Sequence, residues 1–189
     1  AGHVAGRVAH ALDLTGVVTV LDVGGGLGQY ARALCAAAPA LRAVVLDRPE
    51  VAAMGREEVA GTALEDRLTF VGGDYHEDHH WGDGFDLVLL ANVLHQETAT
   101  RAAEMVRRAT RALAPGGRVA IVDFRIDDRR REHLLGTLFA INMRDFGDTW
   151  TEPDLRGWMQ AAGLDHVTRT DIGPDRWLLT ARASRLRRP

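Results

Sequence analysis

Short apolar runs rich in β-branched residues alternate with helical patterns along most of this chain. The apolar runs lie at residues 17–22, 43–47, 68–72, 85–90 and 118–124, and the helical patterns between them lie at residues 3–14, 29–38, 49–60 and 97–114. Strands that alternate with helices usually pair in parallel, and apolar runs of this kind are typical of strands buried on both faces. The pattern predicts a doubly wound α/β architecture with helices on both faces of the sheet.

The last third of the chain departs from this alternation. Helical patterns at residues 132–146 and 151–162 precede two further strand-like runs at residues 164–171 and 176–181, with only a short turn between the runs. Two strands joined by so short a turn can pair only antiparallel. We therefore expect a seven-stranded, mostly parallel sheet that ends in an antiparallel hairpin. A chain of 189 residues fits one domain, which we place at residues 1–182.

Composition excludes several classes of function. All 23 basic residues are arginine, which excludes a lysine nucleophile, a lysine Schiff base and a Gly-Lys-Ser/Thr phosphate loop. The formal net charge of -3 gives no electrostatic reason to expect a nucleic-acid partner. No apolar run reaches the roughly 20 residues of a membrane-spanning helix, so we expect no membrane association. The single cysteine, Cys35, cannot form an internal disulfide, which favours a cytoplasmic location.

A glycine-rich segment lies between the first strand and the helix that follows it. Its sequence is Asp22-Val-Gly24-Gly-Gly26-Leu-Gly28. Glycines let a ligand approach the backbone closely, and the amides at the start of the next helix are free to bind it. The second strand ends in Asp47, about twenty residues on, where a carboxylate can accept hydrogen bonds from both hydroxyls of a ribose. We therefore expect an adenosine-containing ligand at the carboxyl ends of these strands.

Two kinds of adenosine ligand are compatible with this segment. Residues 26–31 match Gly-x-Gly-x-x-Ala, a weak signal for a nicotinamide dinucleotide. The spacing of Gly24, Gly26 and Gly28, with Asp22 two residues before the first, fits S-adenosylmethionine better. That ligand has no pyrophosphate to bind.

Polar residues are concentrated in the loop after the third strand. Asp74 is placed to accept a hydrogen bond from an adenine amino group, and Tyr75 is placed to pack on the ring. Residues 74–80 contain three histidines and three acids, a composition that a metal site also has. Their spacing matches no recognised zinc pattern. We expect no bound metal and a solvated loop that partly lines the adenine pocket.

Several motifs together carry a resemblance to a known family. They lie at residues 20–28, 47–51, 73–75, 93–95, 112–117, 151–155 and 162–163. This set resembles the S-adenosylmethionine-dependent O-methyltransferases. The most similar branch contains the plant phenolic enzymes, acetylserotonin O-methyltransferase and bacterial enzymes that methylate polyketide and other aromatic natural products. The resemblance covers almost the whole chain and implies the Rossmann-like methyltransferase fold.

The resemblance implies a cofactor site at the strand ends. The family's cofactor residues correspond to Asp22, Gly24, Gly26 and Gly28 around the methionine part, Asp47 at the ribose, and Asp74 with Tyr75 at the adenine. Arg48 stands where the family usually has leucine, which would change how one face of the adenine is covered. Asn92, just past the fourth strand, is a further candidate for cofactor binding.

A histidine general base of the family corresponds to His95, just past the fourth strand. Methyl transfer to a phenol needs an aligned acceptor and removal of a proton of pKa about 10, and histidine titrates near neutrality. The alternative is that His95 caps the following helix. The family often has two acids that orient the base. The first corresponds to Asp123, whereas the second position holds Thr149, with Asp148 the one neighbour that could replace the missing acid.

Residues outside the cofactor site complete the resemblance. The family lines its acceptor pocket with the helix at residues 132–146, which makes Phe139, Met143, Phe146 and Trp150 candidates for contacts with an aromatic substrate. Family members usually carry an additional N-terminal winged-helix domain that forms a homodimer. We expect a homodimer if the full-length protein has that domain. The arginine-rich segment at residues 183–189 is expected to form a disordered tail.

The sequence thus predicts an S-adenosylmethionine-dependent methyltransferase acting on a hydroxyl of an aromatic or polyketide-type small molecule. C- or N-methylation of a similar acceptor is an alternative, because the fold does not fix the atom that is methylated. A nicotinamide-dependent reductase and a cofactor-binding module without turnover are also compatible with the glycine-rich segment.

Overall fold

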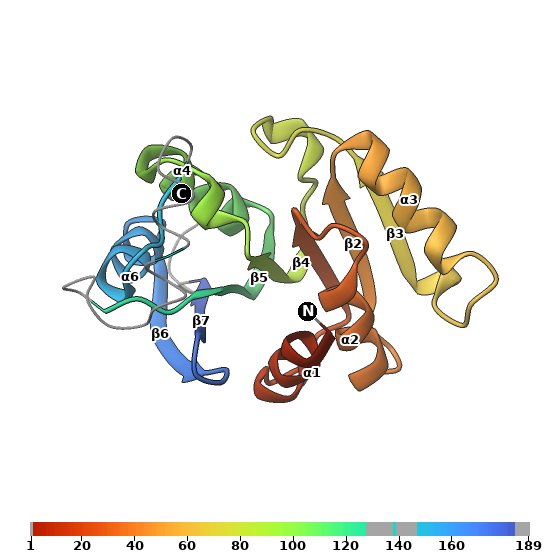
Figure 1. Cartoon of the computed structure of the whole chain (residues 1–189), viewed down its shortest axis with the longest axis horizontal. Coiled ribbons are helices and arrows are strands. Elements are labelled where there is room, and N and C mark those ends of the chain that lie inside the picture. Colours follow the sequence, from red (N-terminus) through yellow and green to blue (C-terminus); the bar gives the residue numbers. More distant parts are fainter. Residues whose placement is uncertain (1, 128–137, 139–146, 184–189) are drawn as a thin grey trace.

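A computed structural model describes residues 2–127, 138 and 147–183 of the chain. Within them, seven strands form one sheet in the order β3-β2-β1-β4-β5-β7-β6 (Figure 1). The strands are β1 (Thr19–Val23), β2 (Arg42–Asp47), β3 (Leu68–Gly72), β4 (Phe85–Ala91), β5 (Leu113–Phe124), β6 (Leu164–Asp171) and β7 (Arg176–Ala183). Strands β1 to β5 pair in parallel, while β7 pairs antiparallel with both β5 and β6. The predicted fold class is confirmed.

Helices connect the parallel strands and cover both faces of the sheet. They are α1 (Gly2–Ala11), α2 (Gln29–Ala37), α3 (Pro49–Val59), α4 (Ala99–Arg111) and α6 (Glu152–Ala161), with short 3-10 turns η1 (Glu65–Arg67), η2 (Asp78–His80) and η3 (Leu94–Gln96). Pro49 occupies the first turn of α3, where its missing amide hydrogen costs no helical hydrogen bond.

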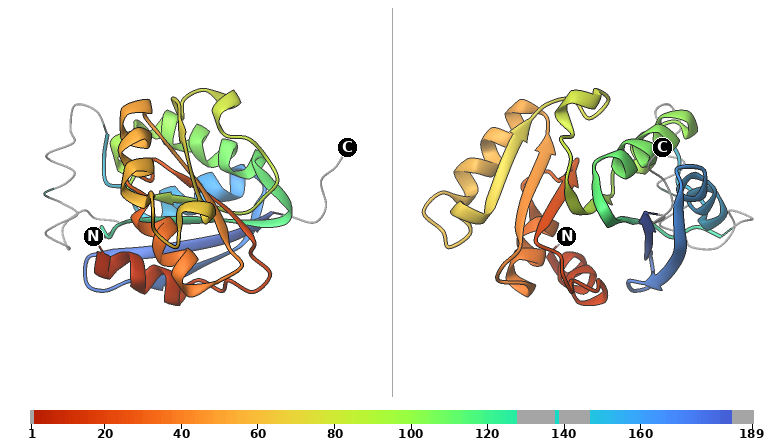
Figure 2. Two further views of the ribbon diagram at one scale, coloured as in Figure 1. Left: turned by 90° about the vertical axis from the view of Figure 1, so that its right-hand side faces the viewer. Right: turned by 180° about the vertical axis from the view of Figure 1, so that it is seen from behind.

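Each face of the sheet has its own hydrophobic core. Residues such as Val8 of α1 and Leu34 of α2 belong to one core, together with residues of α3. Met105 of α4 and Leu155 of α6 belong to the other core. Figure 2 shows these two groups of helices on the two sides of the strands. The central strands are apolar throughout because side chains of both orientations are buried.

The boundary between α4 and β5 differs from the prediction. The predicted helix at residues 97–114 is shorter, because Thr98 caps α4 at its start by accepting a hydrogen bond from a backbone amide. Strand β5 begins at Leu113 rather than at Arg118. The Pro-Gly-Gly segment therefore lies inside β5, where the register with β4 shifts and Gly116 has φ 80°. The Pro-Gly-Gly segment, which in the sequence indicated the end of a helix, instead forms a bulge within the strand.

The C-terminal part follows the prediction closely. Helix α6 has a capping box in which Thr151 and Asp154 each accept a hydrogen bond from the other's backbone amide. Strand β6 has the predicted bounds, and its pairing with β7 is interrupted near His166, whose φ is 55°. The predicted helix at residues 132–146 and the predicted tail lie almost wholly outside the described residues. In the described part of the chain, every helix is too short or too polar to cross a membrane.

Candidate active site

The glycine-rich segment forms a tight loop between β1 and α2. Gly24, Gly26 and Gly28 have φ values of 65°, 58° and 74°, which side chains of L-residues rarely allow. A Cβ on Gly24 would lie 2.8 Å from Cγ2 of Val93, and one on Gly28 would lie 3.0 Å from Cζ of Phe70. Backbone conformation therefore favours glycine at all three positions, and close packing also restricts Gly24 and Gly28.

Asp22 lies beneath this loop and is fully buried. A Cβ on Gly25 would lie 2.7 Å from its Cγ, so the loop backbone covers the carboxyl group. Neither carboxylate oxygen has a hydrogen-bond partner among the described residues. Burial raises the pKa of Asp22 to about 7, an effect that the nearby Ala31 amide only partly offsets. Asp22 is thus a buried acid whose oxygens have no hydrogen-bond partner within the described residues.

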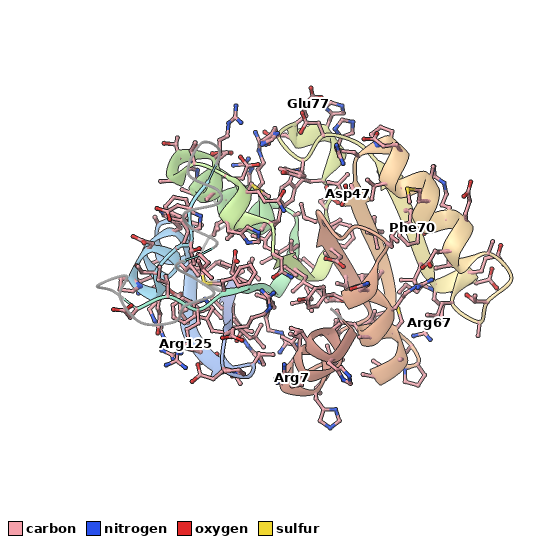
Figure 3. All side chains as sticks on the ribbon, viewed as in Figure 1. Arg7, Asp47, Arg67, Phe70, Glu77 and Arg125 are labelled. Carbon is pink, nitrogen blue, oxygen red and sulfur yellow. The ribbon has the colours of Figure 1, made fainter. Side chains whose placement is uncertain are left out.

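Asp47, at the end of β2, ties the loop to the sheet. Its Oδ2 accepts a hydrogen bond of 2.7 Å from the backbone amide of Gly26, and its Oδ1 accepts one of 2.8 Å from the amide of Arg48. Figure 3 shows Asp47 toward the carboxyl ends of the strands, with Arg67 toward their other ends. The side chain of Arg48 is exposed and pairs with Glu50 at 3.4 Å.

The loop after β3 contributes a second polar group on this edge. Tyr75 donates a hydrogen bond of 3.0 Å to Oε1 of Glu97, and His76 contacts the same oxygen through Nε2 at 3.0 Å. Burial, followed by the charge of Glu97, raises the pKa of Tyr75. Asp74 is exposed and accepts a hydrogen bond from the amide of His76. Glu97 was not among the predicted site residues, because in sequence it resembled an ordinary residue at a helix start.

Three residues of the same loop cluster at the surface. One ligand atom each of Glu77, His79 and His80 lies within 4.8 Å of the others. Nε2 of His79 lies 3.5 Å from Oε2 of Glu77, a distance consistent with an ion pair. That this loop holds no metal stays a prediction.

His95 and Asp123 form a buried pair beside the glycine loop. His95 lies in η3, directly after β4, and Asp123 lies near the end of β5. Nδ1 of His95 lies 2.7 Å from Oδ1 of Asp123, and the backbone amide of His95 donates to Oδ2 at 3.3 Å. Both side chains are almost fully buried. The helix that follows is capped by Thr98, so the alternative role of His95 as its cap is wrong.

The segment before α6 packs directly on the turn that holds His95. A Cβ on Gly147 would collide with the backbone carbonyl of His95. Nε1 of Trp150 donates a hydrogen bond of 2.8 Å to the carbonyl of Leu94. Oδ1 of Asp148 accepts a hydrogen bond of 2.7 Å from the amide of Thr149. Asp148 and Trp150 thus come from a segment adjacent to His95, whereas the other candidate acceptor contacts, Phe139, Met143 and Phe146, lie outside the described residues.

Asn92 joins three elements on the same edge of the sheet. Its φ of 56° is unusual for a residue other than glycine. Its Nδ2 donates a hydrogen bond of 2.8 Å to the hydroxyl of Tyr30 in α2, and its Oδ1 accepts one of 2.7 Å from Nη1 of Arg176 in β7. Tyr30 and Arg176 were not predicted, because no local pattern connects residues so far apart in the chain.

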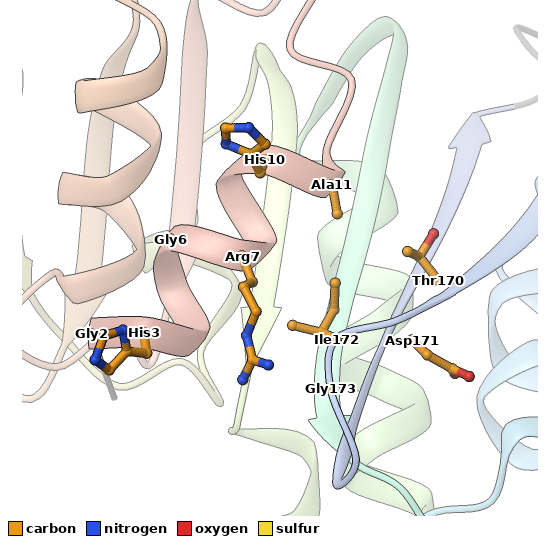
Figure 4. A pocket seen from close by; sticks show the side chains of 10 residues that line it. All are labelled: Gly2, His3, Gly6, Arg7, His10, Ala11, Thr170, Asp171, Ile172 and Gly173. Atoms are coloured by element: carbon orange, nitrogen blue, oxygen red, sulfur yellow. The ribbon is translucent and has the colours of Figure 1, made fainter.

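An open hollow of about 600 Å³ lies away from this group of residues, between α1 and the turn that joins β6 to β7 (Figure 4). Its lining includes His3, Arg7 and His10 of α1, Asp171 at the end of β6, and Ile172 in the turn. None of the predicted site residues lines it.

Comparison with known proteins agrees with the resemblance found in the sequence. A family model described as an O-methyltransferase domain matches residues 3–165. The chain is 33% identical over 178 residues to the tetracenomycin polyketide synthesis 8-O-methyl transferase TcmO of Streptomyces glaucescens, covering 92% of this chain and 52% of that protein. It is 38% identical over 160 residues to the mitomycin biosynthesis 6-O-methyltransferase of Streptomyces lavendulae, covering 85% and 45%.

Comparison with solved structures also finds a methyltransferase. The crystal structure of human N-acetylserotonin methyltransferase in complex with S-adenosylmethionine matches with a TM-score of 0.83 and 25% identity, covering 95% of this chain and 51% of that one. The chain thus spans about half the length of the relatives it matches. Since the family model matches most of the sequence, this chain belongs to the O-methyltransferase family.

Proposed function

We propose that this protein transfers a methyl group from S-adenosylmethionine to a hydroxyl of an aromatic or polyketide-type small molecule. The observation that carries this proposal is the buried pair of His95 and Asp123 at the strand edge that also carries the glycine loop. A paired histidine beside a cofactor loop suits removal of a proton from an acceptor held near a methyl donor. The named activities of the two bacterial relatives support the same reaction class.

The residues at the glycine loop fit S-adenosylmethionine. The exposed face of a backbone held by Gly24, Gly26 and Gly28 admits a ligand closely. The Asp22 carboxylate has no hydrogen-bond partner in the described chain, and an ammonium group of a ligand would supply one. The remaining cofactor contacts of the proposal are Asp47 at the ribose, Asp74 and Tyr75 at the adenine, and Arg48 and Asn92 beside them. When bound, this cofactor supplies a methyl group activated by a positively charged sulfur.

His95 is the proposed general base. With the Asp123 carboxylate at Nδ1, that nitrogen carries the hydrogen, and the proton of the acceptor hydroxyl would be taken at Nε2. Asp123 holds the ring in this orientation and stabilises the imidazolium that forms. The amide of His95 donates to the same carboxylate, which fixes the turn as well as the ring. Asp123 therefore acts as a positioning residue, with Asp148 a second candidate from the adjacent segment.

The acceptor side of the proposal rests on the apolar residues named from the sequence. Phe139, Met143, Phe146 and Trp150 are proposed to contact the aromatic ring of the acceptor. We also propose a homodimer if the full-length protein has the additional N-terminal domain. The free, buried thiol of Cys35 supports a cytoplasmic location.

Calorimetry separates this function from that of a nicotinamide-dependent reductase. We expect binding of S-adenosylmethionine and S-adenosylhomocysteine and no binding of NADH. Binding of NADH alone would exclude the methyltransferase. A screen of phenolic acceptors with cofactor labelled in the methyl group then tests for transfer. NMR of the product identifies the methylated atom, so attachment to carbon or nitrogen would support C- or N-methylation instead. Cofactor binding without transfer to any acceptor would support a binding module.

A further inference from the structure

Arg176 is a half-buried arginine at the start of β7, and its only side-chain hydrogen bond within the described chain is to a neutral group. Nη1 donates to Oδ1 of Asn92 at 2.7 Å. Across the described residues, no carboxylate oxygen forms an ion pair with it within 4.0 Å. Its neighbours differ, since Arg125 pairs with Asp171 at 3.5 Å and Arg169 pairs with the same acid at 2.8 Å. A guanidinium has five N–H donors, so Arg176 retains unused donors.

The position of Arg176 connects it to the methyl-transfer site. Its Cζ lies 3.9 Å from the centroid of the Phe124 ring, a cation–π distance. The same Phe124 ring also contacts His95, whose ring centroid lies 5.2 Å away in an edge-on arrangement. Arg176 and the proposed base therefore contact the same aromatic ring. Strand pairing explains this placement, because Arg176 lies opposite Phe124 where β7 runs antiparallel to β5.

Arg176 is also held rigidly and close to the cofactor loop. Asn92, which accepts its hydrogen bond, donates in turn to Tyr30 in the first turn of α2, directly after Gly28. Val93, the residue after Asn92, is the side chain that limits space above Gly24. Stacking on Phe124 and the bond to Asn92 fix the plane of the guanidinium. A guanidinium whose plane is already fixed loses less conformational entropy when it forms a bidentate pair of hydrogen bonds with a carboxylate.

We propose that Arg176 is a carboxylate-binding residue of the methyl-transfer site. This inference rests on the proposed function, since it needs a ligand at this edge of the sheet. Two ligands of that reaction can carry the carboxylate: S-adenosylmethionine, at its amino-acid end, and an aromatic acceptor that bears an acid group on the same ring as its hydroxyl or on a fused ring. Both ligands offer a carboxylate to the guanidinium. Pairs of ligands that differ in the carboxylate distinguish the two sources.

The first arm of the test concerns the cofactor. Calorimetry compares S-adenosylhomocysteine with 5′-methylthioadenosine, which keeps the adenosine and the sulfur and lacks the amino-acid end. The second arm uses protein saturated with S-adenosylhomocysteine and compares 3-hydroxy-1-naphthoate with 2-naphthol, which lacks the carboxylate. Each arm is measured on the wild type and on Arg176→Gln, Arg176→Lys and Arg125→Gln. Arg125→Gln is the matched control, because that arginine already has an acid partner.

We expect Arg176→Gln to weaken one carboxylate-bearing ligand by about tenfold or more and to leave its carboxylate-free partner within about twofold, since charge-assisted hydrogen bonds have about this strength. The affected arm identifies the source of the carboxylate. Arg176→Lys keeps the positive charge but cannot form two parallel hydrogen bonds to a carboxylate, so we expect an intermediate loss of affinity. This variant also provides the test if Arg176→Gln does not fold. Arg125→Gln should leave all four affinities unchanged.

Two results would overturn the inference. Unchanged affinity for both carboxylate-bearing ligands in Arg176→Gln and Arg176→Lys would show that the guanidinium binds neither. Equal weakening of ligands with and without a carboxylate would show a purely structural role. Either result, together with tight binding of S-adenosylhomocysteine by the wild type, leaves the proposed function intact. A wild type that binds neither adenosine ligand would instead overturn the proposed function, and this inference with it.

Discussion

The carboxyl edge of the sheet has two halves that are held together in different ways. In the half at β1 and β2, backbone conformation dominates: glycines with positive φ shape the loop, and Asp47 binds the amide of Gly26. In the half at β4, β5 and β7, side chains from distant parts of the chain hold one another. His95 bonds to Asp123, and Asn92 bonds to Arg176. The first half is thus specified locally, whereas the second exists only after the sheet has formed.

The largest expected effect comes from the side-chain half. His95→Ala should lower turnover on a phenolic acceptor by about a hundredfold to ten-thousandfold, because general-base catalysis contributes about that much. The affinity for S-adenosylhomocysteine, measured by calorimetry, should change by less than about twofold. His10→Ala, on the exposed side of α1, is the control and should retain full turnover. Wild-type turnover in His95→Ala would show that alignment of the acceptor alone drives the reaction.

The next effect concerns Asp22, the acidic side chain that is buried beneath the glycine loop. Its pKa is raised from the usual 3.8 to about 7 by burial. Between these values the unfolded chain has lost the proton while the folded chain keeps it. The folded state therefore loses stability as pH rises from about 4 to about 7. Outside this window, the contribution of Asp22 to the free energy of unfolding is constant. One pKa unit corresponds to about 1.4 kcal/mol, so the full effect is about 4 kcal/mol at most.

Urea unfolding of the wild type and Asp22→Asn at pH 5 and pH 8 measures this effect. The quantity compared between the two proteins is the change in the free energy of unfolding from pH 5 to pH 8. The variant cannot ionise, so its free energy of unfolding should fall less between the two pH values than that of the wild type. Other titrating groups are common to both proteins and cancel. An identical pH dependence in the two proteins would show that Asp22 is not held neutral when the protein is folded.

Substitutions in the glycine loop separate conformational strain from packing. Gly24→Ala should lower the free energy of unfolding by about 2–4 kcal/mol, because its φ is positive and its Cβ would lie 2.8 Å from Val93. Gly26→Ala is the matched variant. Its φ is equally positive, but no atom lies within 4 Å of the added Cβ, so strain alone should cost about 1 kcal/mol. Equal losses in both variants would show that contact with Val93 is unimportant.

The same contrast explains what could be predicted from the sequence. The glycine loop, Asp47, and the parallel strands with their final hairpin follow from local patterns, because strand ends and positive φ values constrain residue type directly. The hydrogen bond from the amide of Gly26 to Asp47 joins residues 21 positions apart, within one strand–helix–strand unit. His95 and Asp123 were found through the family resemblance, which places both residues although they are 28 positions apart.

Other parts of the site carry no local signal. Arg176 contacts Asn92 from 84 positions away, and the two residues meet because β5 pairs with both β4 and β7. Glu97 was assigned to a helix start, and its role as a buried acceptor for Tyr75 depends on how the loop after β3 folds back. The early start of β5 was missed because a bulge has the same turn-forming residues as a helix end.

The smallest expected effect tests whether the two halves are coupled. Tyr30 belongs to the helix that follows the glycine loop, and its hydroxyl accepts a hydrogen bond from Asn92 of the other half. Tyr30→Phe removes that acceptor and should lower the free energy of unfolding by about 1 kcal/mol. In a double-mutant cycle with Asn92→Ala, the two losses should not add, because each single variant already breaks the same bond.

The readout for function in this cycle is cofactor affinity and turnover together. If the two halves are coupled, Tyr30→Phe should lower both quantities modestly. The loss in the double variant should then be smaller than the sum of the losses in Tyr30→Phe and Asn92→Ala, although Asn92→Ala also removes the acceptor of Arg176. If the stability losses add fully, the hydrogen bond carries no coupling energy. The glycine loop and the His95 turn would then be independent structures that share only the edge of one sheet, and the backbone half could be altered without effect on the base.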